Sequence, residues 1–264
     1  MDAPVRVTMA GAGNAFGDGG MLQTCVHVQA AGGDGALLVD CGATALTGLK
    51  RLGLEPGDVS VVAVSHLHGD HFGGLPFLVL DGQFTRRVRP LHLVGPPGLE
   101  ERLGQAMEVL FPGSSSVSRR FEVRVHEVAP GSSAHVEGVA VRAFEADHAA
   151  GAVALALRVE VAGRTIAYSG DTAWTDTLID VAAGADLFLC EGYTYERAVR
   201  YHLHVPELLA RLDRLSCRRL LLTHAGPQVL ARRAELGLDL AEDGMVLEIQ
   251  GVSREAGPAG WTRG

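Results

Sequence analysis

The chain has few cysteines and no long apolar run, and these absences exclude two classes of protein. Its four cysteines (Cys25, Cys41, Cys190 and Cys217) are widely spaced and form no CxxC pair, which argues against a disulfide framework and favours reduced, mostly buried thiols. No apolar run approaches the roughly 18 residues that span a bilayer, and residues 1–10 hold no apolar signal core. We therefore expect a soluble cytoplasmic protein with no membrane partner.

The chain also lacks an excess of basic residues. Its formal net charge is −8 and its pI is about 5.7. Affinity for long nucleic acids depends largely on Lys and Arg that neutralise phosphates, so long nucleic acids are not expected partners. Three arginine pairs occur, but they are far apart and form no continuous basic tract: Arg86-Arg87, Arg119-Arg120 and Arg218-Arg219.

No linker or tandem repeat divides the 264 residues, of which 47% are hydrophobic. This is enough to bury a sizeable core. We expect a single domain over residues 1–250, followed by a loose, polar, Gly-rich tail over residues 251–264.

Both halves of the chain combine strands with helices. Periodicity and turn residues predict strands at 5–10, 22–30, 36–39, 59–64, 91–94, 121–128, 139–144, 153–161, 165–168, 187–190, 220–223 and 245–249. They predict helices at 46–52, 77–80, 97–110, 177–182, 205–215 and 229–236.

A cluster of metal-capable side chains follows the apolar strand at residues 59–64. Because Gly69 and Gly73-Gly74 interrupt the pattern, we expect this cluster on a loop that leaves a sheet edge. Imidazoles and carboxylates are common ligands for zinc, and four of them so close together suggest two metals. A single histidine in a loop is usually only solvated, but crowded ionisable groups are costly to bury without a cation. The four residues are His66, His68, Asp70 and His71.

Three further residues that could bind a metal ion lie just after apolar strands: His148 after Asp147, Asp171 in Ser169-Gly170-Asp171-Thr172, and His224 after Thr223. Each of them alone could be a turn former. Their recurrence at strand ends indicates that they converge with the first cluster.

The order of these groups over residues 5–250 resembles the motif order of the metallo-β-lactamase superfamily: HLHGDH, a later His, SGDT, then LTH. The resemblance implies an α+β fold, a four-layer αβ/βα sandwich with two central sheets and outer helices. It also implies a centre for two divalent metal ions, with Zn²⁺ favoured and Mn²⁺ or Fe²⁺ as alternatives, and suggests a homodimer. By position in the motifs, one ion would be held by His66, His68 and His148, the other by Asp70, His71 and His224, with Asp171 bridging them.

Two further motifs, Cys190-Glu191-Gly192 and His202-Leu203-His204, resemble the phosphodiesterase subset that includes tRNA 3′-processing endonucleases of the RNase Z type. In that subset a Glu orients a His that protonates the leaving oxygen, and Glu191 and His202 occupy the matching places. His204 competes for this role, although it also looks like the start of a helix. A surface salt bridge from Glu191 to Arg197 or Arg200 is the structural alternative. The predicted catalytic residues are Asp70, Glu191 and His202.

Only 22 residues separate His148 from Asp171, which leaves no room for the tRNA-gripping arm of the processing enzymes. Di-iron relatives usually carry Glu at the position of His68, so hydrolysis is favoured over oxygen chemistry. We expect hydrolysis of a small phosphodiester by metal-activated hydroxide. The alternatives are a carboxylic ester, lactone or thioester hydrolase on the same centre and, from a different class, a non-catalytic metal-stabilised binding module.

Overall fold

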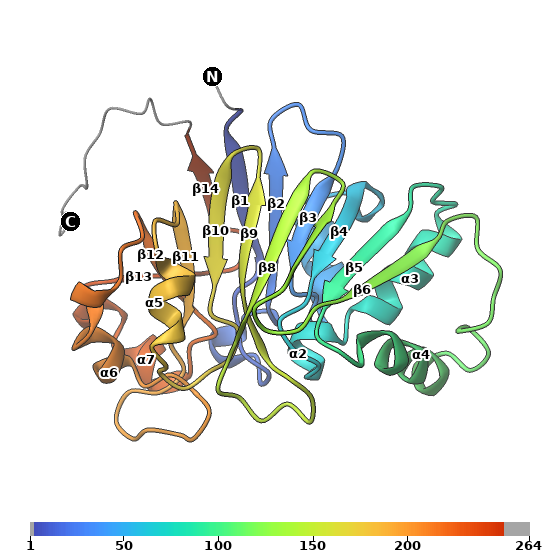
Figure 1. Ribbon diagram of the computed structural model, residues 1–264. Helices are drawn as coiled ribbons and strands as arrows, with labels where there is room; N and C mark the ends of the chain where they lie inside the picture. The colour runs from blue at the N-terminus through green and yellow to red at the C-terminus, as the bar shows by residue number, and fades with distance from the viewer. Residues whose placement is uncertain (1–2, 251–264) are drawn as a thin grey trace.

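The computed structural model describes residues 3–250, and its strands form two seven-stranded sheets that pack face to face (Figure 1). The predicted C-terminal tail lies outside the described residues. In the first sheet the strands run in the order β14-β1-β2-β3-β4-β5-β6. They span Val5–Gly11 (β1), Cys25–Ala30 (β2), Ala36–Val39 (β3), Val59–Ala63 (β4), Leu91–Gly95 (β5), Val123–Glu127 (β6) and Val246–Ile249 (β14).

The second sheet has the order β13-β12-β11-β10-β9-β8-β7. Strands β10 to β13 run parallel, whereas β7 to β10 are antiparallel. The carboxyl ends of β10, β11 and β12 therefore open at one edge of the sheet. The strands span Ser133–Val136 (β7), Val139–Glu145 (β8), Leu155–Val161 (β9), Arg164–Tyr168 (β10), Leu187–Glu191 (β11), Leu220–Thr223 (β12) and Asp239–Leu240 (β13).

Helices cover the outer face of each sheet, which confirms the predicted α+β, four-layer αβ/βα sandwich (Figure 1). Over residues 3–250, none of the helices has the length and apolar character needed to cross a membrane. The first sheet carries α1 (Ala45–Arg51), α2 (Gly69–Phe72), α3 (Leu75–Phe84) and α4 (Leu99–Leu110), and the second carries α5 (Thr177–Ala182), α6 (Val205–Leu209) and α7 (Pro227–Ala231).

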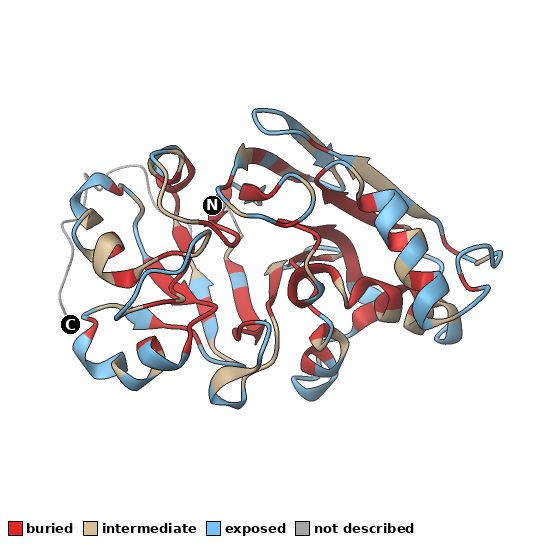
Figure 2. Cartoon of the chain, turned by 90° about the horizontal axis from the view of Figure 1, so that it is seen from below, coloured by how far each residue is buried: buried red, intermediate tan, exposed pale blue. Residues whose placement is uncertain are grey.

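The main core lies between the two sheets and joins buried side chains of both (Figure 2). Alternation along each strand explains this layering, because successive side chains point to opposite faces. On β4, Val61 and Ala63 face the other sheet, whereas Val62, and Val64 just after the strand, pack toward α3.

The structure corrects several predicted elements. The expected loop after His68 contains a helical turn, α2, in which the backbone N–H of His71 and of Phe72 bonds the His68 carbonyl. The predicted helix at 205–215 is wrong beyond residue 209, because Arg211 leaves the helical conformation, with φ −124° and ψ 11°, and a short 3₁₀ turn follows. The helix predicted at 229–236 begins earlier, with Pro227 at its first position, and ends at Ala231.

Two strands were not predicted. Strand β7 pairs with β8 through a two-residue turn, Glu137-Gly138, in which both residues have positive φ as in a type I′ hairpin. Strand β13 has only two residues, so its pairing with β12 leaves no periodic signal in the sequence.

Candidate metal centre

The residues predicted as ligands come from four separate segments that meet at one edge of the sandwich. His66 and His68 follow β4, and α2 carries the next two residues. The others follow β8, β10 and β12, whose ends reach the same lower edge in Figure 1. The structure brings all seven together in two adjoining groups: His66, His68 and His148; and Asp70, His71, Asp171 and His224.

The first group consists of three imidazoles whose nitrogens face one another. His68 Nδ1 lies 3.2 Å from His66 Nε2 and 3.1 Å from His148 Nε2. Burial lowers the pKa of both His66 and His148, which favours the neutral ring. Neutral imidazole nitrogens that converge in this way are the donor set that a divalent transition metal binds.

The second group is fully buried and mixes imidazole with carboxylate. His71 Nε2 lies 3.2 Å from Asp70 Oδ2 and 3.3 Å from Asp171 Oδ1, and His224 Nε2 lies 3.1 Å from Asp70 Oδ2. Yet His71 Nε2 and Asp171 Oδ1 are buried and make no hydrogen bond with any described residue. Buried polar atoms without partners are costly, so these residues fit a cation that would satisfy them together.

Asp171 lies between the two groups. Its Oδ1 faces His71 Nε2, whereas its Oδ2 is 4.0 Å from His148 Nε2 in the first group. Each carboxylate oxygen thus points to a different group, which is the arrangement that a bridging ligand requires.

Asp40, which the sequence analysis missed, holds the His71 ring through Nδ1, the nitrogen that faces away from Asp70 and Asp171. Its carboxylate accepts hydrogen bonds from His71 Nδ1 at 2.7 Å and from the backbone N–H and hydroxyl of Ser65 at 2.7 and 2.8 Å. Burial alone would lower the pKa of His71, but the carboxylates of Asp171 and Asp40 outweigh burial and raise it. A carboxylate behind a ligand imidazole fixes the ring and increases its basicity. Asp40 directly follows β3, so the same strand-end rule that found the other residues could have found it.

Two glycines let the backbone approach the centre closely. A Cβ atom at Gly42 would lie 2.3 Å from the carbonyl oxygen of Asp70. At Gly170, which has a φ of +59°, a Cβ atom would lie 2.6 Å from the carbonyl oxygen of Leu155. Larger residues at either position would displace the segments that carry Asp70 and Asp171.

Glu191 and His202 form a pair beside the second group. Glu191 is completely buried at the end of β11, which excludes a surface salt bridge to Arg197 or Arg200. His202 Nδ1 lies 2.5 Å from Glu191 Oε1, and Glu191 Oε2 accepts the backbone N–H groups of Thr172 and Leu203. Burial alone would lower the pKa of His202, but the hydrogen-bonded carboxylate of Glu191 has the larger effect and raises this pKa above its usual value.

His204 has a different place. It is the residue before the first turn of α6, and its Nε2 bonds the carbonyl oxygen of Tyr195 at 2.6 Å. The ring of His202, in contrast, stands 4.7 Å from the ring of Tyr193, and 21% of its side chain is exposed. His202 also meets the distances of a third possible metal group, together with Asp171, Glu191 and His224. Its role as a proton donor therefore stays a prediction.

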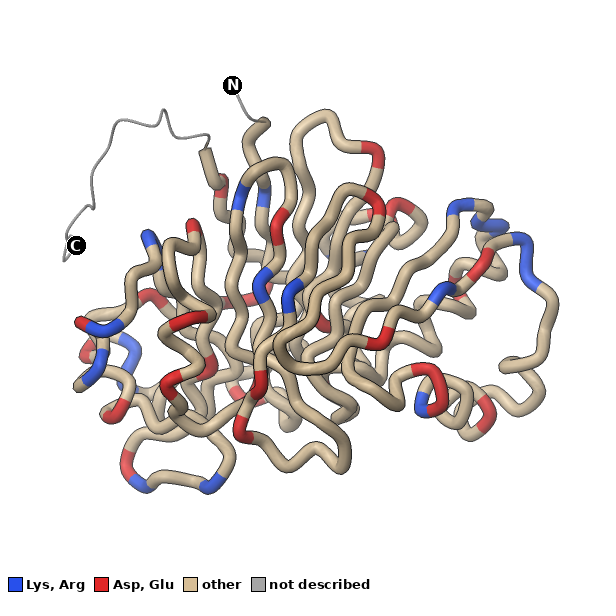
Figure 3. The backbone as a smooth tube through the Cα atoms, in the orientation of Figure 1, with Lys and Arg blue, Asp and Glu red and all other residues tan. Residues whose placement is uncertain are grey.

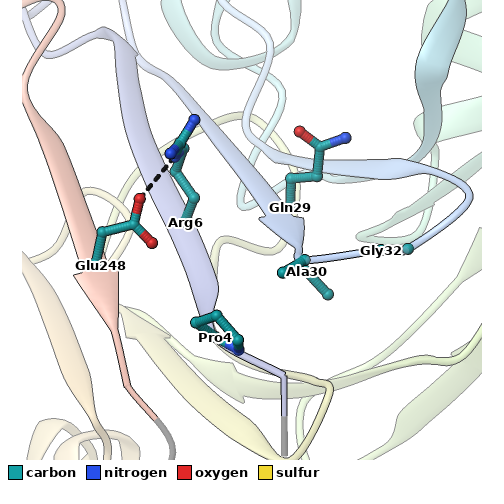
Figure 4. Close-up of a pocket in the computed structure, with 8 residues that line it drawn as sticks. Pro4, Arg6, Gln29, Ala30, Gly32 and Glu248 are labelled. Carbon is teal, nitrogen blue, oxygen red and sulfur yellow. Dashed lines mark hydrogen bonds and ion pairs between the residues drawn. The ribbon is translucent and has the colours of Figure 1, made fainter.

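The pocket shown in Figure 4 is at the opposite end of the sandwich, beside the β2–β3 turn, and holds about 390 Å³. Its charged groups already pair with each other, because Arg6 Nε lies 2.7 Å from Glu248 Oε1. The converging ligand types lie at the other edge, so we place the functional site there.

Known proteins share both the sequence and the fold over most of the chain. A Ribonuclease Z of Mycobacterium sp. (strain KMS) is 30% identical over 246 residues, which cover 85% of each chain. Human tRNase Z, short form (ELAC1), superposes with a TM-score of 0.75 at 26% identity, over 93% of this chain and 99% of the other. The metallo-β-lactamase fold protein YhfI of Bacillus subtilis, at 22% identity, superposes with a TM-score of 0.73 over 93% and 99%.

The sandwich fold and its clustered ligands define a metal-dependent hydrolase of the metallo-β-lactamase superfamily, from the branch of Ribonuclease Z and related phosphodiesterases. Within that branch, the chain belongs to the family described as Anti-Pycsar protein Apyc1, whose model matches residues 5–245.

Proposed function

We propose that this protein is a phosphodiesterase that hydrolyses a small phosphodiester with the help of two Zn²⁺ ions. The observation that carries the proposal is the contact between His202 Nδ1 and the buried carboxylate of Glu191 at 2.5 Å. The Ribonuclease Z relatives, whose substrate class contains phosphodiester bonds, support it.

The metal ions would be held by the two groups described above, with Asp171 shared between them. Five imidazoles and one carboxylate besides Asp171 suit Zn²⁺ better than Mg²⁺ or Ca²⁺, which prefer oxygen ligands. When bound, such a pair of ions lowers the pKa of a water and neutralises charge at phosphorus.

His202 would donate a proton to the leaving oxygen. Glu191 occupies Nδ1, which leaves Nε2 as the nitrogen that can face a substrate. The bonded carboxylate raises the pKa of His202 and thus keeps the ring protonated at higher pH. An alkoxide that leaves from phosphorus needs this proton, whereas a thiolate needs it much less.

A small substrate is supported by the segment between His148 and Asp171. After the short loop that follows His148, this segment forms β9 and β10, joined by the two-residue turn Ala162-Gly163, so no arm extends from it. Lys and Arg are scattered along the tube in Figure 3 and do not gather into one basic tract. Both features argue against a grip on a long nucleic acid.

The test is a screen of the Zn²⁺-loaded protein against a bis-aryl phosphate, cyclic nucleotides, lactones and thioesters. We expect turnover of phosphodiesters, and His202→Ala should reduce kcat about 10²- to 10⁴-fold while keeping its metal. His204→Ala and the exposed His135→Ala serve as matched histidine controls, with little loss expected. Thioester or lactone turnover without phosphodiester turnover would refute the substrate class, and no turnover in any class would favour a binding module. Loss of metal from His202→Ala would make His202 a ligand.

A further inference from the structure

Tyr201 has a backbone conformation that large residues rarely adopt. Its φ is +69°, in the left-handed region, where a bulky side chain is strained. Six non-glycine residues among residues 3–250 have positive φ, and three of them lie at the metal centre: Asp40, Tyr201 and His224. Strained backbone persists only where the surroundings hold it, and it concentrates at functional sites.

Tyr201 connects His148, in the first group of candidate ligands, with the pair formed by Glu191 and His202. Its carbonyl oxygen lies 2.9 Å from His148 Nδ1, so the Nδ1–H of His148 donates to it and the Nε2 lone pair faces His68. The next two residues are held by Glu191: His202 through its ring and Leu203 through its backbone N–H, at 3.1 Å. A turn of the chain at residue 201 therefore serves both contacts.

The phenol ring takes no part in these contacts. The guanidinium of Arg200 lies 4.4 Å from the ring centroid, and the hydrogen bond to His148 uses only the main chain. The backbone conformation, and not the side chain, is thus the feature that reaches the centre.

We propose that Tyr201 is a positioning residue whose left-handed backbone fixes His148 as a metal ligand through the Tyr201 carbonyl and places His202 opposite Glu191. The inference rests on the metal centre of the proposed function but not on the identity of the substrate. Partners that hold ligand imidazoles from behind typically contribute about 10- to 100-fold in metal affinity.

Three variants separate the backbone from the ring. Tyr201→Gly tolerates positive φ and keeps the carbonyl, Tyr201→Ala removes the ring, and Tyr201→Val strongly disfavours the left-handed region. Chelator competition should show that the Gly and Ala variants bind Zn²⁺ within about threefold of wild type. The Val variant should bind one of its two ions about 10- to 100-fold more weakly. Arg86→Val, at an exposed residue with a φ of +60° in the turn after α3, applies the same strain far from the centre and should bind normally.

Wild-type affinity in Tyr201→Val, or an equal loss in Tyr201→Gly, would overturn the proposal. Absence of Zn²⁺ binding by the wild type would instead refute the metal centre itself. A second measurement does not depend on the folding of any variant: ¹⁵N NMR of the metal-free wild type should show His148 protonated at Nδ1. The Nε2–H tautomer in that spectrum would contradict the positioning role.

Discussion

Glu191→Gln tests the central chemical argument because it removes a charge and little else. The glutamine is nearly isosteric, and its oxygen can still accept the backbone N–H groups of Thr172 and Leu203, which keeps the buried end of β11 satisfied. Its NH₂ group would then face His202 Nδ1, where Glu191 Oε1 now lies at 2.5 Å. The charge that favours protonated His202 is thereby lost.

The size of the effect follows from this contact. A hydrogen bond to a charged group contributes about 1.5 to 3 kcal/mol, which corresponds to about 1 to 2 pKa units. Asp171, whose Oδ2 lies 3.9 Å from His202 Nδ1, remains and limits the change. Because Glu191 raises the pKa of His202, its removal lowers that pKa, so the protonated donor is lost at lower pH.

The assay is the pH dependence of kcat/KM with an alkyl and with an activated aryl leaving group. We expect the alkaline limb to move about 1 to 2 units toward lower pH and kcat on the alkyl substrate, measured above the shifted pKa, to fall about 10- to 10²-fold. The aryl substrate should lose less, because a good leaving group needs little protonation. An unmoved alkaline limb together with equal losses on both substrates would refute the proton-donor argument.

Three other perturbations address the metal centre. Asp40→Asn should weaken Zn²⁺ binding about 10- to 100-fold in chelator competition without unfolding the protein, because it removes the charged acceptor of the His71 Nδ1 hydrogen bond. Unchanged affinity for Zn²⁺ would exclude this orienting role of Asp40. Asp171→Ala should reduce the metal content in elemental analysis, because Asp171 faces both groups of ligand residues. As a control, Asp147→Ala, at the exposed residue next to His148, should keep two ions. Full metal occupancy in Asp171→Ala would refute the bridging role. Free Zn²⁺ at 100 times its Kd should stabilise the folded protein by about 2.7 kcal/mol, so removal of the metal should lower the Tm by about 5 to 10 °C. Equal Tm values in calorimetric scans with and without metal would contradict the fit of these buried groups to a cation.

Strand-end chemistry explains why much of the candidate site could be predicted. Metal-ligand residue types within a few residues of the end of an apolar strand, such as Asp171 after β10 and His224 after β12, are visible in the sequence because the strand pattern marks where each strand stops. Parallel neighbours then bring these ends to one edge of a sheet. Short or locally paired elements such as α2, β7 and β13 left no comparable pattern, so their prediction failed.

The same rule could have found Asp40 as a residue that follows a strand, but it could not have found what Asp40 does. Its function depends on His71, which is 31 residues further along the chain, and no motif links the two. The choice between His202 and His204 also needed coordinates, because only the fold shows that Glu191 reaches the first ring and that the second precedes α6.

The sequence by itself determined the set of seven ligand candidates, since these depend on local periodicity and on residue types at strand ends. The order of their motifs also resembled one superfamily, and that resemblance implied the sandwich class. Only the tertiary structure decided which buried carboxylate, Asp40, holds His71 from the side away from the other ligands, that Glu191 reaches His202, and how the carbonyl of Tyr201 meets His148. Those relations join segments distant in the chain, and their distances arise from the packing of two sheets, which no local pattern encodes.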